Sequence, residues 1–143
     1  MELQDLLNVA LKIESTGYEN YSRLAERSSG ETAAFFQEMA NQEKKHMEIF
    51  QDLFKNLPKP SQGQWVDDEN AGYLMAFAQT SIFPKLKAQL PHNMNEAVQK
   101  AIEVEKDSIL FYNDLQVFFP QKEALQSIID EEKRHMKDLL KRL

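Results

Sequence analysis

The sequence contains no cysteine among its 143 residues. This absence excludes disulfides, zinc ribbons, thiol chemistry and iron centres that are ligated by cysteine. Glycine is scarce, with four residues, and no apolar run approaches the roughly 20 residues that a membrane-spanning helix needs. Positive charge is in deficit, since the formal net charge is -6. We therefore expect no nucleic-acid partner and no membrane partner.

The N-terminus lacks the features of a secretory signal peptide. Glu2 and Asp5 stand where such a segment carries basic residues, and no apolar stretch follows them. We therefore expect a cytoplasmic location. The chain length suits a single domain over residues 1–143, and a hydrophobic share of 42% provides enough apolar side chains for a core.

Apolar residues recur at helical spacing in four segments, which predicts an all-α fold. The first two helices form a hairpin over about residues 2–57, and the last two form a second hairpin over about residues 93–142. Prolines and a loop-like stretch mark the long crossover between them, about residues 58–92, in which we expect one short helix at about residues 68–80.

Local signals mark the ends of the helices. Ser28, Ser29 and Gly30 end the first helix and cap the second. Asn93, with Glu96 three residues later, resembles a capping box at the start of the third helix. Pro120 suits the first turn of the fourth helix.

Polar residues interrupt the middle of each apolar seam. The seam of the first helix is Leu3, Leu7, Ala10, Glu14, Gly17, Tyr21, Leu24 and Ser28. Single glutamates interrupt the first and third helices, and a Glu-x-x-His motif interrupts the second and fourth: Glu14, Glu105, Glu43 with His46, and Glu132 with His135. The two halves align around these residues, so the chain is a duplicated helical hairpin.

The spacing from the hairpin turns predicts that these six side chains share one layer of the core. Each single glutamate precedes its turn by about 15 residues, and each Glu-x-x-His motif follows its turn by a similar number, so all six lie at about 20 Å from the turns. Four ionised carboxylates in an apolar interior are costly unless cations compensate them. Two divalent ions balance their charge.

The donor set indicates which ions suit the site. A Glu-x-x-His motif places a carboxylate and an imidazole on one helical face. Oxygen and nitrogen donors without sulfur suit iron or manganese, and zinc remains an alternative. Two single glutamates with two Glu-x-x-His motifs make the di-iron carboxylate bundle pattern. Glu131 competes with Glu132, but only Glu132 has the spacing to His135.

The segment Glu105–Tyr112 and both Glu-x-x-His helices resemble the rubrerythrin branch of the ferritin-like superfamily, and the resemblance extends over nearly the whole chain. It implies a ferritin-like four-helix bundle with a long crossover, a homodimer or larger homo-oligomer, and two iron ions in a dinuclear non-haem centre. The ligands that the resemblance implies are Glu14, Glu43, His46, Glu105, Glu132 and His135. Glu43 and Glu132 would bridge the two ions.

Two features depart from the family pattern. Ser108 stands where typical rubrerythrins have an additional glutamate, and no rubredoxin-like domain is present. Turnover would therefore need an external electron donor. We expect an oxidoreductase that oxidises ferrous iron with peroxide or dioxygen, as a peroxidase or ferroxidase. The alternative is a module that sequesters or relays iron without turnover, and the six-ligand set argues against a purely structural bundle.

Tyr21 and Tyr112 each lie seven residues beyond a single glutamate. We interpret them as core aromatics rather than as sites of one-electron oxidation. A hydrogen bond from either phenol to a ligand carboxylate stays open at this point.

Overall fold

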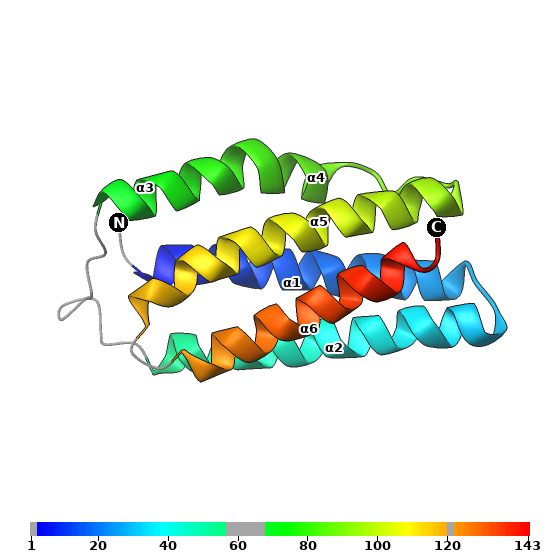
Figure 1. Ribbon diagram of the computed structural model, residues 1–143, viewed down its shortest axis with the longest axis horizontal. Helices are drawn as coiled ribbons and strands as arrows, with labels where there is room; N and C mark the ends of the chain where they lie inside the picture. The colour runs from blue at the N-terminus through cyan, green and yellow to red at the C-terminus, as the bar shows by residue number, and fades with distance from the viewer. Residues whose placement is uncertain (1–2, 57–67, 120–121) are drawn as a thin grey trace. The chain divides into compact units, whose positions relative to one another are not determined.

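The computed structural model describes residues 3–56, 68–119 and 122–143 (Figure 1). Its long helices are α1 (Leu3–Glu26), α2 (Gly30–Lys55), α5 (Met94–Leu115) and α6 (Glu123–Leu140). The crossover contains α3 (Asp68–Phe77), the π-helical turn η2 (Ala78–Ile82) and α4 (Phe83–Lys87), and a 3-10 turn, η3 (Gln116–Phe118), follows α5. No strand occurs in these ranges. The predicted all-α fold is confirmed.

The chain divides into two compact units. The first-hairpin unit holds α1 from Leu7 onward together with α2. The second-hairpin unit holds the helices from α3 to α6, and residues 3–6 at the start of α1 group with it. No helix within the described ranges is long and apolar enough to cross a membrane.

The turn between α1 and α2 lies where the sequence predicts it. Ser28 Oγ donates a hydrogen bond to the carbonyl oxygen of Leu24 at 2.7 Å, and Ser29 is the N-cap residue of α2. Gly30 has a φ of 59°, which is a left-handed conformation that glycine adopts without steric cost. A β-carbon there would meet nothing within 4 Å, so the backbone angle is what favours glycine.

In the second-hairpin unit, α5 packs against α6 and also contacts α3, η2 and α4 (Figure 1). Asn93 caps α5, and its side chain accepts a hydrogen bond from the backbone N–H of Glu96 at 2.9 Å, as predicted. Helix α6 begins at Glu123, and the predicted place of Pro120 in its first turn lies outside the described residues.

The crossover is more helical than the sequence predicts. The expected helix ended near residue 80, but helical structure continues through η2 and α4 to Lys87. Pro84 lies in the first turn of α4, where a missing N–H and a fixed φ are tolerated. The predicted helix at about residues 68–80 is therefore shorter than the helical segment that forms.

Candidate metal centre

A triad of side chains that could hold a metal ion lies within the first-hairpin unit. Glu14 extends from α1, and Glu43 and His46 extend from α2. One carboxylate oxygen or imidazole nitrogen of each lies within 4.8 Å of those of the other two. The Nδ1 atom of His46 is 3.5 Å from Oε1 of Glu14. At most 2% of any of these three residues is exposed.

The second-hairpin unit contains an equivalent triad. Glu105 comes from α5, and Glu132 and His135 come from α6, with ligand atoms again within 4.8 Å of one another. The Nδ1 atom of His135 lies 3.6 Å from Oε1 of Glu105 and 4.0 Å from Oε1 of Glu132. These three residues are also buried.

The two triads repeat one another in geometry as well as in sequence. In each, the single glutamate and the Glu-x-x-His motif come from paired helices. The spacing of three residues puts the motif's two side chains on one face of its helix. The imidazole Nδ1 lies 3.5 Å from Oε1 of the single glutamate in the first triad and 3.6 Å in the second. The duplicated hairpin therefore produces two nearly identical sets of donors.

The donor sets fit a divalent metal ion. Each triad buries two carboxylates beside one imidazole, so its formal charge is -1 even when the imidazole is protonated. Burying a net negative charge costs on the order of several kcal/mol unless a cation offsets it. Carboxylate oxygen and imidazole nitrogen are ligands for iron, manganese and zinc. In both histidines, Nδ1 is the nitrogen that faces the carboxylates.

Glu131 does not share the surroundings of Glu132. Its side chain is 30% exposed, and its Oε1 atom lies 3.9 Å from an Arg134 nitrogen. Glu132, by contrast, is 1% exposed. These observations support Glu132 over Glu131 as the partner of His135.

Both tyrosines pack as core aromatics. Tyr21 stacks on Phe36, with ring centroids 6.4 Å apart and an interplanar angle of 14°. Tyr112 meets Phe111 edge to face at 6.1 Å and 76°. Both are buried, and the question of a hydrogen bond from either phenol to a candidate ligand carboxylate stays open.

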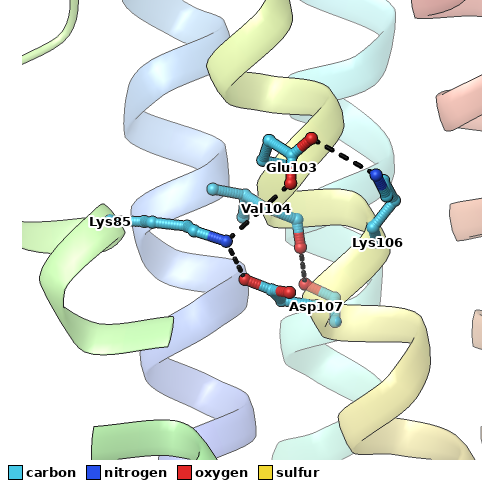
Figure 2. Close-up of polar contacts among 6 residues, drawn as sticks. Lys85, Glu103, Val104, Lys106 and Asp107 are labelled. Carbon is cyan, nitrogen blue, oxygen red and sulfur yellow. Dashed lines mark hydrogen bonds and ion pairs between the residues drawn. The ribbon is translucent and has the colours of Figure 1, made fainter. Parts of the chain in front are cut away.

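A charged pair beside Glu105 is not apparent from the sequence. Lys85 of α4 reaches Asp107 of α5, with 2.5 Å between Nζ and Oδ2, and lies 3.9 Å from Oε2 of Glu103 (Figure 2). Asp107 is buried and stands two residues after Glu105. The pair ties the crossover to the helix that carries a candidate ligand.

Ser108 is the next residue of α5. Its Oγ atom donates a hydrogen bond to the carbonyl oxygen of Val104 at 2.7 Å. The side chain is buried, and the hydroxyl is directed along its own helix. This is a common way for a serine within a helix to satisfy its donor.

Comparisons with known proteins agree with this geometry. A model of the Rubrerythrin family matches residues 5–143. The structure is similar to a crystal structure from Thermotoga maritima that is described as a ferritin-like diiron-carboxylate protein, with a TM-score of 0.75 and 27% identity. That likeness covers 99% of this chain and 93% of the other. No curated protein matches.

Proposed function

Because the chain belongs to the rubrerythrin family, we propose that its two triads form one dinuclear non-haem iron centre and that the protein oxidises ferrous iron with peroxide or dioxygen. The observation that carries this proposal is the buried triad that occurs once in each hairpin. A single triad offers three ligands, which is a small set for one iron ion. Two triads together offer the ligand pattern of a di-iron carboxylate protein.

The charges support a joint site for two ions. Four carboxylates from Glu14, Glu43, Glu105 and Glu132 carry the charge that two ferrous ions neutralise. In this proposal Glu43 and Glu132 would bridge the ions, as the resemblance to rubrerythrins implies. Glu14 with His46, and Glu105 with His135, would then hold the separate ions. The Thermotoga maritima relative is described as a diiron-carboxylate protein, which supports this assignment.

Two ferrous ions supply two electrons together, which is the number that reduction of peroxide to water consumes. The protein's own residues would hold the ions, orient them and keep bulk water away. Carboxylate oxygens favour the ferric state because hard anionic donors stabilise the higher charge. Atoms Oε2 of Glu14, Oε1 of Glu43 and Nδ1 of His46 are shielded from solvent, as are the corresponding atoms of the other triad.

A second candidate function is iron binding without turnover, for sequestration or relay. One observation favours it: Ser108 directs its hydroxyl to the carbonyl of Val104, so that position supplies no further carboxylate to the site. These 143 residues also contain no cysteine for a cysteine-ligated electron donor. Turnover would therefore use a donor outside these residues. Manganese or zinc is the alternative metal in either function.

Mixing experiments distinguish the two functions. The protein would be loaded with ferrous iron without oxygen and then mixed rapidly with hydrogen peroxide or, separately, with dioxygen. We expect near-ultraviolet ferric absorbance to appear faster than with free ferrous ion. After one turnover the reaction should stop until a chemical reductant is added.

The other outcomes are equally informative. A chain that binds two ferrous ions but oxidises them no faster than free ion supports sequestration or relay. A chain that binds no iron contradicts both functions.

A further inference from the structure

Gly17 occupies an interior position of α1, one turn after Glu14. Glycine is less favourable than alanine inside a helix because it loses more backbone entropy on folding. A positive φ would justify glycine, but Gly30 is the glycine with a positive φ among the described residues. The conformation of α1 therefore gives no reason for glycine at this position.

The space around Gly17 gives a reason. A β-carbon placed there would lie 3.1 Å from Oε2 of Glu43, 3.4 Å from its Cδ and 3.5 Å from its Cγ. All three nearest atoms belong to the same carboxylate side chain. The carboxylate of Glu43 thus lies against the bare backbone of α1.

We propose that Gly17 is a positioning residue for Glu43: its missing side chain leaves the space that lets the Glu43 carboxylate reach Glu14 and His46. This inference rests on the proposed metal centre and adds a residue to it. A β-carbon at residue 17 would displace the carboxylate by a few tenths of an ångström. Metal–ligand distances vary by only about 0.2 Å within a well-formed site, so such a displacement weakens coordination.

The second hairpin lacks this arrangement. The aligned position is Ser108, which carries a β-carbon and directs its hydroxyl to Val104. The close approach of a Glu-x-x-His carboxylate to a glycine is therefore a feature of the first hairpin. A substitution at residue 17 tests the placement of Glu43 without altering any ligand.

The test compares Gly17→Ala with Gly72→Ala. Gly72 lies in α3, also without a positive φ, and a β-carbon there meets nothing within 4 Å. Metal affinity would be measured by anaerobic titration with cobalt(II) and with ferrous iron, and the visible cobalt spectrum would report the ligand geometry. We expect Gly17→Ala to lose about tenfold or more in affinity, as changes around ligands do, and to alter the cobalt spectrum. Gly72→Ala should bind as the wild type does.

A double-mutant cycle with Glu43→Asp tests the contact itself. Aspartate is shorter by one methylene and withdraws the carboxylate from residue 17. The affinity lost through Glu43→Asp should be smaller in the Gly17→Ala protein than in the wild type. Additive losses would show that the two positions do not act through this contact.

Thermal unfolding of the metal-free proteins separates positioning from folding. Gly17→Ala should be at least as stable as wild type without metal, so its weaker binding would not reflect a damaged helix. Unchanged affinity and an unchanged cobalt spectrum in Gly17→Ala would overturn the role of Gly17 and leave the metal centre standing. A wild-type chain that binds no metal would overturn the proposed function itself.

Discussion

The two hairpins carry the same three candidate ligands but surround them differently. In the first, Gly17 leaves space into which the carboxylate of Glu43 extends. In the second, α5 is braced by the crossover through the pair of Lys85 with Asp107. A duplicated ligand set therefore does not imply duplicated surroundings. Side chains of the same chemical type can be more or less restricted by their neighbours. Two metal positions with the same donors can therefore differ in their binding properties.

Helix α5 makes a second polar contact with the crossover. Nζ of Lys100 in α5 donates a hydrogen bond to the carbonyl oxygen of Ala88 at 2.6 Å, just after α4 ends. Burial lowers the pKa of Lys100 below its usual value. The unfolded chain therefore keeps this proton to higher pH than the folded one. The free energy of unfolding should therefore rise with pH between the folded and the unfolded pKa of Lys100. In this window the folded chain has lost the proton and no longer buries the charged form.

The largest expected effect comes from removing the proposed bridging ligands. Glu43→Ala and Glu132→Ala should each weaken binding of both ions, by more than the roughly 10–100-fold that loss of an outer partner costs. Anaerobic ferrous titration measures this. The exposed Glu48 and the half-buried Glu131 supply matched controls, Glu48→Ala and Glu131→Ala, which should bind two ions. If only one hairpin's variant loses iron, the triads act separately and the comparison fails.

A smaller effect should follow from removing the ion pair of Lys85 with Asp107. Lys85→Ala leaves the buried Asp107 without its cation, which should lower the free energy of unfolding by about 1–3 kcal/mol. Urea unfolding followed by circular dichroism measures it. Lys87→Ala, in the same short helix but at an exposed position, is the control and should change stability by about 0.5 kcal/mol or less. Equal losses in the two variants would show that the pair does not brace α5.

The smallest expected effect comes from replacing the N-cap residues of α5 and α2. Asn93→Ala removes a side chain that accepts a hydrogen bond from Glu96 N–H, and should cost about 1 kcal/mol. Ser29 caps α2 without a side-chain hydrogen bond to the described residues of its turn. Ser29→Ala should therefore cost about 0.5 kcal/mol or less. Similar losses, measured by thermal unfolding of both variants, would contradict this difference.

The features that could be predicted from the sequence are those that depend on residues close together in the chain. Helical periodicity predicts the four long helices, and the fixed spacing of Glu-x-x-His predicts which carboxylate accompanies each imidazole. Asn93 is predictable because a capping bond joins residues three apart. These features are set by the geometry of single helices, so they need no knowledge of packing.

The features that the sequence does not reveal involve two elements at once. Lys85 and Asp107 come from different helices, and no spacing rule connects them. The contact between Gly17 and Glu43 depends on how closely α1 approaches α2. Proline usually interrupts a helix, but Pro84 lies in the first turn of α4, where a helix tolerates it. The single domain over residues 1–143 and the binding of iron by the triads stay predictions.

The central claim is that the triads of the two hairpins hold one pair of ions. Crystals of the anaerobically iron-loaded protein, measured at the iron absorption edge, test it most directly. We expect two anomalous peaks roughly 3.5–4 Å apart, the usual separation in two-metal sites, with Glu43 and Glu132 each contacting both ions. Peaks too far apart for one carboxylate to bridge, a single peak, or none in fully loaded crystals would contradict it.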